Sequence, residues 1–280
     1  MHRVLGALAV AFTALAIAAQ AMAAIDDHDF AGPVPGIPDK TWIDLLSQIF
    51  PDIAVDERGY ATASKVIDLR SIGAGDESWI GCGDKIQFQD RDARPIRLSG
   101  RDYVVVTVMI EDDCVGPIGL FDASGKLVDA VNVKGDQHVS FSGDYVRPLG
   151  ADGALVIASL WHDNSSQSYD ISSLILARPE GLSSIGDVFA LGSRDCDGKT
   201  NSTVTEEAAV RVVPDGNPLA RIDVAVERDI QKLGSDCETQ IGRAGKTIFT
   251  GAWRWNAQKK AYEPHTKELK LLDDWNQKRS

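Results

Sequence analysis

The sequence is poor in the residues and motifs from which most active sites are built. It has five histidines in 280 residues, and none has the HExxH or HxH spacing of a zinc site. The nucleophile motif GxSxG, the Walker phosphate loop and a GxGxxG turn between a strand and a helix are also absent. The common signatures of metalloproteases, serine hydrolases and nucleotide-binding enzymes are therefore excluded. The sequence assigns no catalytic residue, no metal ligand and no cofactor.

Long apolar runs are lacking after the N-terminus. The one such run, Val4 to Ala19, follows the basic pair His2-Arg3 and ends at Ala21-Met22-Ala23. This pattern predicts a secretory signal peptide over residues 1–23, cleaved after Ala23. A membrane anchor is the alternative, but the run is short for a membrane span and polar residues follow at once. We expect a soluble mature protein of about 257 residues, periplasmic or secreted, without membrane insertion.

Basic residues are fewer than acidic ones. The chain has 29 Lys and Arg against 41 Asp and Glu, which gives a formal net charge of −12. The acidic surplus is spread along the chain, and an acidic surface repels phosphate backbones. We therefore expect no nucleic-acid partner. Solubility is a sufficient reason for the surplus itself.

The two ends of the mature chain differ from its centre. Residues 24–60 are predicted to be a Pro- and Gly-rich arm followed by one short helix. Asp39 can cap a helix that starts near Thr41. Apolar residues at i, i+3, i+4 and i+7 give that helix one buried face. Residues 266–280 form a charged C-terminal tail, either a short docked helix or a frayed end.

Residues 61–265 are predicted to be mainly β, built from antiparallel four-stranded repeat units. A similar pattern of strand and turn residues recurs over Ile96–Val133, Arg147–Leu191 and Val210–Tyr262. A four-stranded pattern that repeats at intervals of roughly 50 residues is typical of a propeller-like or open β-array. A two-sheet β-sandwich is the alternative. The middle unit is expected to form the core, with the other two on either side.

Within this domain some segments carry a clear pattern. Tyr103–Ile110 has β-branched residues on both faces, which predicts a central strand buried on both sides. The third unit alternates apolar and polar residues, which predicts one solvated face. Ala61–Ile72 is predicted to be one strand, and the polar stretch Gly192–Glu207 a loop.

Cysteine is rare, and no CxxC pair supports a thioredoxin-like site or a zinc knuckle. The even number of cysteines in an exported chain predicts two disulfides among Cys82, Cys114, Cys196 and Cys237. The first and third units place their cysteines similarly, since Cys82 stands 18 residues before Gly100 and Cys196 stands 20 before Gly216. This correspondence favours Cys82–Cys114 and Cys196–Cys237.

The turn phrases of the units resemble FG-GAP-type β-propeller repeats over roughly residues 85–265. Phe88–Pro95 (FQDRDARP) is similar to the acidic calcium loop of that family followed by a strand. Leu149–Gly153 (LGADG) keeps one acidic residue of that loop, and the loop glycines are missing. The resemblance implies a propeller-like fold in which calcium binding has been lost.

The sequence offers few candidate site residues. Trp161, His162 and Asp163 stand together at the end of a buried strand, where they could line a binding patch. Trp253 and Trp255 share a face of their strand, where they would stack on a ligand if exposed or join the core if buried. Three carboxylate pairs are interpreted as solvated loop ends: Asp112 with Asp113, Asp90 with Asp92, and Glu206 with Glu207.

Two functions remain open from the sequence. The first is a binding or scaffold module of the cell envelope whose partner is an envelope protein or a small ligand. The alternative is an envelope hydrolase for glycans or peptides that uses loop carboxylates and His162. An inhibitor-like module that presents a disulfide-stapled loop is a third possibility. A deep pocket shared by His162 and two carboxylates would favour the hydrolase.

Overall fold

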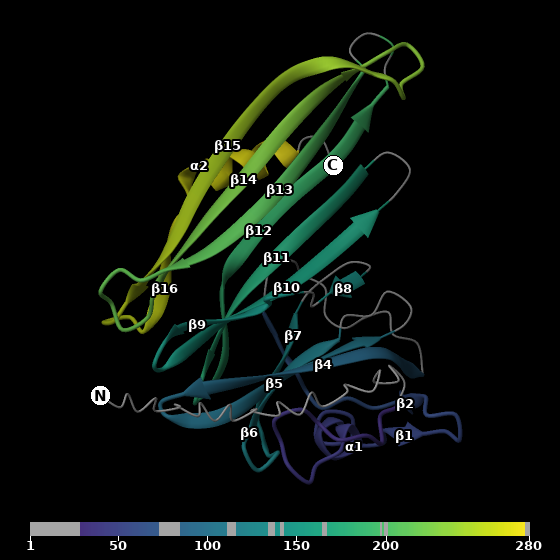
Figure 1. Ribbon diagram of the computed structural model, residues 1–280, viewed down its shortest axis with the longest axis vertical. Coiled ribbons are helices and arrows are strands. Elements are labelled where there is room, and N and C mark those ends of the chain that lie inside the picture. The colour runs from purple at the N-terminus through teal and green to yellow at the C-terminus, as the bar shows by residue number, and fades with distance from the viewer. Residues whose placement is uncertain are drawn as a thin grey trace, which may run out of the picture.

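The computed structural model describes residues 29–72, 85–110, 116–133, 138–140, 143–163, 167–196, 198 and 201–277, without the side chains of 138–140 and His162. The protein is mainly β, as the sequence predicts, and its strands form two sheets. Figure 1 shows these sheets arranged one above the other along the long axis, with α1 below the lower sheet.

The lower sheet has seven strands in the order β1-β2-β4-β5-β6-β7-β3, and β3 runs parallel to β7 while the other pairs are antiparallel. Its central strand β5 is buried on both faces, as its sequence predicts. The strands are β1 (Ala54–Val55), β2 (Ala61–Ala63), β3 (Arg70–Ile72), β4 (Ile86–Leu98), β5 (Arg101–Ile110), β6 (Pro117–Asp122) and β7 (Leu127–Val133).

The prediction of one strand over Ala61–Ile72 is wrong. The segment forms β2 and β3, which belong to different ends of the lower sheet. Between them, the carboxylate of Asp52 accepts hydrogen bonds from Ser64, and the N–H of Ile67 donates to the carbonyl of Ile49 at 2.9 Å. Because Ser64 and Ile67 make these hydrogen bonds, the residues between β2 and β3 do not pair with a neighbouring strand.

The upper sheet has nine strands. They follow the order β16-β15-β14-β13-β12-β11-β10-β8, with β9 also on β10. Their bounds are β8 (His138–Ser140), β9 (Val146–Gly150), β10 (Gly153–Asp163), β11 (Gln167–Arg178), β12 (Gly181–Asp195), β13 (Ser202–Val213), β14 (Arg221–Leu233), β15 (Gln240–Asn256) and β16 (Ala261–His265).

The chain forms three four-stranded antiparallel meanders: β4–β7, β9–β12 and β13–β16. The last two are continuous, because Gly192–Asp195 of β12 pairs with Ser202–Thr205 of β13. The prediction of one long loop over Gly192–Glu207 is therefore wrong at both ends. Among the described residues the strands form neither a closed barrel nor a propeller.

The helix α1 (Trp42–Leu46) is capped by Thr41 and not by Asp39, which the sequence suggested as its cap. The N–H and hydroxyl of Thr41 donate to the carboxylate of Asp44 at 2.8 and 2.9 Å, and the N–H of Asp44 donates back to the hydroxyl. This is a capping box, and its backbone hydrogen bond lowers the pKa of Asp44. Asp39 instead adopts a left-handed conformation, φ 60°.

Three apolar clusters divide the interior. The first lies between one face of the lower sheet and the segment that carries α1, with Phe30, Leu45, Phe50 and Phe88 among its members. The second joins the other face of the lower sheet to β10 and β11. The third joins the opposite face of β10–β12 to β14, β15 and α2 (Lys267–Asn276). Residues of β9–β12 therefore belong to two of the three clusters.

Candidate functional site

The predicted patch Trp161-His162-Asp163 lies near the end of β10. Trp161 is 43% exposed and Asp163 is also exposed. In the antiparallel ladder, Trp161 is opposite Asp170 of β11 and His138 of β8. The side chain of His162 lies outside the described part of the structure, so a ligand role for this patch stays a prediction.

Asp170 carries a carboxylate whose environment opposes its charge. Burial raises its pKa above the ordinary value, and the Ser172 hydroxyl, at 3.4 Å, offsets only part of the shift. The folded protein therefore holds this proton more tightly than the unfolded chain. The ionised carboxylate of Asp170 therefore destabilises the fold at pH 7. This penalty is lost as the pH falls through the folded pKa and the group takes up its proton.

Replacing Asp170 with asparagine is expected to stabilise the protein at pH 7 because it removes that unfavourable charge. The melting temperature should rise by about 1–3 °C, a value reduced for solvent screening. The difference should shrink towards pH 4, as measured by thermal unfolding across a pH series. Asp163→Asn, an exposed change in the neighbouring strand, is the control and should shift the melting temperature by less.

The two tryptophans of β15 belong to the interior. Trp253 is buried in the third cluster and packs over Gly186 of β12, where an added Cβ would lie 2.6 Å from the indole nitrogen. Trp255 is half-buried and packs edge-on against Tyr262. The core alternative is confirmed for Trp253, and a stacking platform of both rings is wrong.

The interpretation of Glu206 as a solvated loop end is also wrong. Its side chain is fully buried in β13 and forms an ion pair with Arg228 of β14 at 2.7 Å. The other carboxylate oxygen accepts from the N–H of Leu191 at 3.0 Å and from the amide of Asn276 at 2.7 Å. The Arg228 guanidinium lies 3.5 Å from the ring centroid of Trp275. This closed cluster fixes α2 against the sheet.

The other carboxylate pairs have separate outcomes. Asp90 and Asp92 lie inside β4, next to a register shift between Phe88 and Asp90, so the expected loop in this segment is wrong. The sequence resembled a calcium loop there because acidic residues alternate, but alternation also suits an exposed strand. Asp112 and Asp113 lie outside the described residues.

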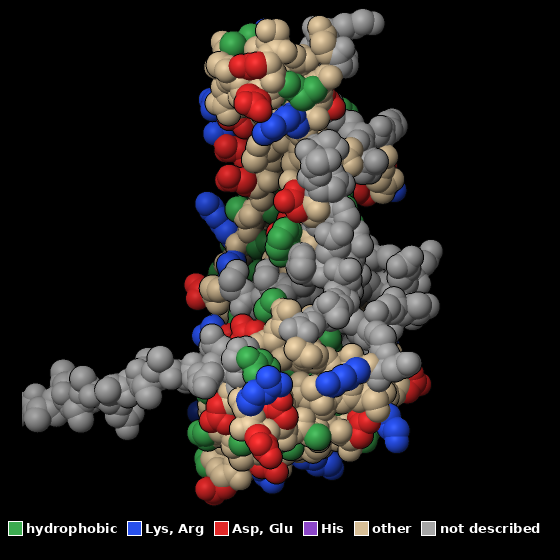
Figure 2. Space-filling model, turned by 90° about the vertical axis from the view of Figure 1, so that its right-hand side faces the viewer, with side chains coloured by type: hydrophobic (Ala, Val, Ile, Leu, Met, Phe, Trp, Pro, Cys, Tyr) green, Lys and Arg blue, Asp and Glu red, His purple; other side chains and the backbone are tan. Residues whose placement is uncertain are grey.

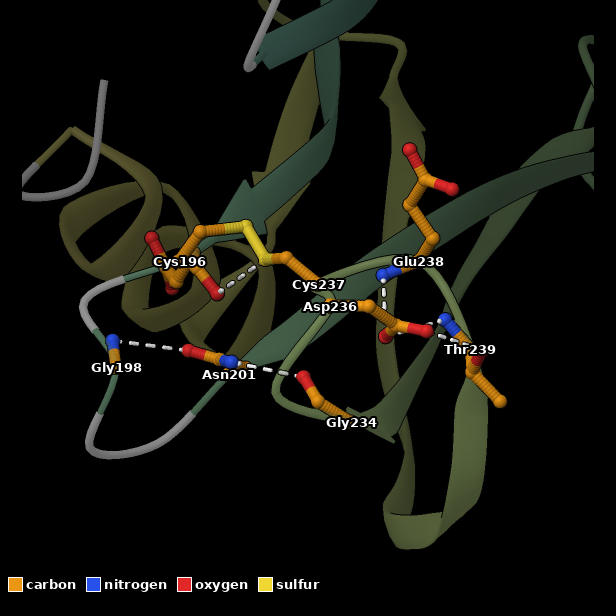
Figure 3. Close-up of a disulfide and its surroundings, with 9 residues drawn as sticks. Cys196, Gly198, Asn201, Gly234, Asp236, Cys237, Glu238 and Thr239 are labelled. Atoms are coloured by element: carbon orange, nitrogen blue, oxygen red, sulfur yellow. Dashed lines mark hydrogen bonds between the residues drawn. A yellow bond between two sulfur atoms is a disulfide. The ribbon is translucent and has the colours of Figure 1, made fainter.

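The disulfide Cys196–Cys237 is confirmed, with its Cα atoms 5.9 Å apart. Figure 3 shows that it joins the connection after β12 to the turn between β14 and β15, with Asn201 bound to both Gly198 and Gly234 beside it. The predicted pair Cys82–Cys114 lies outside the described residues.

The stapled turn carries a strongly acidic carboxyl group. The Thr239 hydroxyl and N–H and the Glu238 N–H donate to Asp236, and these hydrogen bonds lower its pKa to about 2 (Figure 3). The unfolded value lies near 3.9. The stabilisation from these bonds is therefore present above that value and is lost as the pH falls towards 2.

One face of β13–β15 points away from the third cluster, and we call it the distal face. Only the first turn of α2, with Lys267 and Glu268, reaches its edge. From Arg221 to Arg228, half-buried and buried residues alternate along β14, in agreement with the prediction that one side of this strand is in contact with solvent. Cross-strand pairing arranges its residues in rows. They are Glu207, Ala209 and Arg211 of β13, Asp223, Ala225, Glu227 and Asp229 of β14, and Lys246, Ile248, Thr250 and Ala252 of β15.

A shallow cleft of about 640 Å³ crosses the distal face. Ala209, Ala225 and Ala252 form its floor, because their small side chains leave the sheet low between longer neighbours. Its rim includes Arg211 and Glu268. On the side of the molecule in Figure 2, acidic and basic side chains are interspersed in the upper part and form no patch of one sign.

Within the described residues, no helix is long and apolar enough to cross a membrane, and no group of three or more His, Cys, Asp or Glu is arranged to hold a metal ion. Comparisons with protein-family models, with curated proteins and with solved structures found no match to this chain. The resemblance to FG-GAP-type repeats therefore stays a prediction from the sequence.

Proposed function

We propose that the protein is an exported binding or scaffold protein of the cell envelope and that the distal face contacts a partner protein. The carrying observation is the open distal face, since the opposite face of the same strands is covered by α2 and by the third cluster. Its wide, shallow cleft suits a protein surface better than a small molecule, which binds in enclosed pockets.

Two features support export. The disulfide Cys196–Cys237 needs an oxidising compartment, and the sequence of residues 1–23 predicts a cleaved signal peptide. Both features support a partner in the periplasm or outside the cell.

We further propose that the three meanders are copies of one four-stranded unit. Their strands fall at the positions of the repeated sequence phrases. In this proposal the first copy packs face to face with the second, whereas the third extends the second edge to edge through β12 and β13. In this proposal the distal face is exposed because the third copy is the last in the series and no further copy packs on that face.

Site-specific photocrosslinking in the cell that makes the protein tests the binding proposal. A benzophenone side chain at Ala209 or Ala252, on the floor of the cleft, should give one discrete crosslinked product. The same group at Arg58, an exposed residue of the lower part, is the matched control and should give none. Equal labelling from all three positions, or none from the cleft, would contradict the proposal.

A further inference from the structure

The strand β15 extends far beyond the strand that covers its outer edge. It has 17 residues, Gln240–Asn256, but β16 pairs only with Ala252–Asn256. Among the described residues, no strand lies along Gln240–Phe249 on the side away from β14, and we call this segment the open edge. The other outermost strands are shorter: β1, β3 and β8 have two or three residues each, and β9 and β16 have five.

Thr250 shows which backbone groups face outward. Its N–H donates to the carboxylate of Glu268 at 2.8 Å, so it points away from β14. In an antiparallel ladder, every second residue directs its N–H and C=O to the same side. Because the register is unbroken from Trp253 to Gly245, Ile248 and Lys246 direct theirs outward too. These groups can bind an added strand.

Exposed apolar side chains accompany this backbone. Ile248 is 56% exposed and Ile241 is 65% exposed, and both lie on the open edge. A strand added beside Ile248 would cover its side chain and would exchange backbone hydrogen bonds with it. Glu268 ends the available edge, because it already occupies the N–H and hydroxyl of Thr250.

The charge of the open edge selects the partner. It carries Arg243 and Lys246 and no acidic residue, although the whole chain has a net charge of −12. A second copy paired along this edge would bring cations against cations, and edge lysines generally discourage such self-pairing. Asp229 and Glu227 pair with these cations from β14, about 5 Å further from an added strand.

We propose that the open edge of β15 binds an extended acidic segment of a partner protein as an added antiparallel strand. The proposal rests on the binding role proposed above and names its contact. Because the strands are antiparallel, the residue opposite Ile248 precedes the residue opposite Lys246 by two positions. The partner segment therefore has an apolar residue followed, two residues later, by Asp or Glu.

A labelled peptide tests this contact with the whole mature protein. The probe is a fluorescein-labelled decapeptide that alternates Thr and Val in its first half and Thr and Glu in its second half. Anisotropy should show saturable binding below about 1 mM, at least tenfold tighter than a peptide with Lys in place of Glu. No saturation at 1 mM would overturn the proposal.

Three changes separate strand addition from other binding. Lys246→Glu should weaken binding of the acidic peptide about tenfold, whereas Lys259→Glu, in the turn between β15 and β16, should change it less than threefold. Ile248→Pro removes an outward N–H that the added strand needs and should abolish binding. The variant should still fold, since proline is tolerated where an edge N–H faces solvent. Should this variant fail to fold, a peptide N-methylated at alternate amides replaces it and should not bind. Binding that survives N-methylation, or equal effects of the two lysine variants, would overturn the proposal.

The remaining outcomes distinguish this inference from the function on which it rests. A dimer seen by sedimentation velocity and dissociated by Lys246→Glu or Ile248→Pro would overturn the acidic partner in favour of a second copy. Crosslinking at Ala209 without peptide binding would overturn strand addition and leave the binding function in place. Loss of both crosslinking and peptide binding would overturn the two proposals together.

Discussion

Replacing Glu206 with alanine is expected to lower the free energy of unfolding by about 3–5 kcal/mol. The variant leaves the Arg228 guanidinium buried without its anion. It also removes the acceptor for the N–H of Leu191 and the amide of Asn276. The expected effect is large because a buried polar group without a partner has lost its hydrogen bonds to water and gains none in the protein. Urea unfolding of the wild type and the variant measures it.

A surface ion pair provides the matched control. Glu263 pairs with Lys259 at 2.7 Å, but both side chains are exposed. Glu263→Ala should therefore lower the free energy of unfolding much less than Glu206→Ala does. The double variant Glu206→Leu with Arg228→Met should recover part of the loss, because it leaves no buried charge. Equal effects of Glu206→Ala and Glu263→Ala would show that burial does not control the contribution of this pair.

The sequence could predict the strands where a local pattern reports burial. The β-branched run Tyr103–Ile110 gives a central strand, and alternation in β14 gives a strand with one solvated face. It could not predict the burial of Glu206, because its neighbours Thr205 and Glu207 are polar and exposed. What buries Glu206 is contact with Arg228 and with α2, which is about 70 residues away in the chain.

The open edge of β15 could not be predicted from the sequence for a related reason. The composition of β15 predicts a strand near Trp253 and Trp255, but its extension to Gln240 depends on pairing with β14, a partner that local patterns do not show. Whether an edge is open depends on the length of the next strand, here the five residues Ala261–His265. Cysteine spacing was more informative, since the placement of Cys196 and Cys237 indicated the staple.

Removal of that staple should have an effect of similar size. The double variant Cys196→Ser with Cys237→Ser frees a loop with a sequence separation of 41 residues. In the chain-entropy model, this change gives the unfolded chain a freedom that lowers the free energy of unfolding by about 4 kcal/mol. The native turns should stay in place, because Asn201 still binds Gly198 and Gly234 and its carbonyl still accepts from Leu233.

The origin of this loss can be tested through Asn201. Urea unfolding of the double variant should show the full decrease, while its far-ultraviolet circular dichroism matches that of the wild type. Asn201→Ala, which keeps the disulfide but loses the side-chain bridge, should lower the free energy of unfolding by about 1–3 kcal/mol. A decrease below about 1 kcal/mol in the double variant would mean that the two turns stay close in the unfolded chain without the disulfide. The segment of strands β12–β15 would then keep residual structure in the unfolded state. The disulfide would affect only the two turns of the folded protein that it joins.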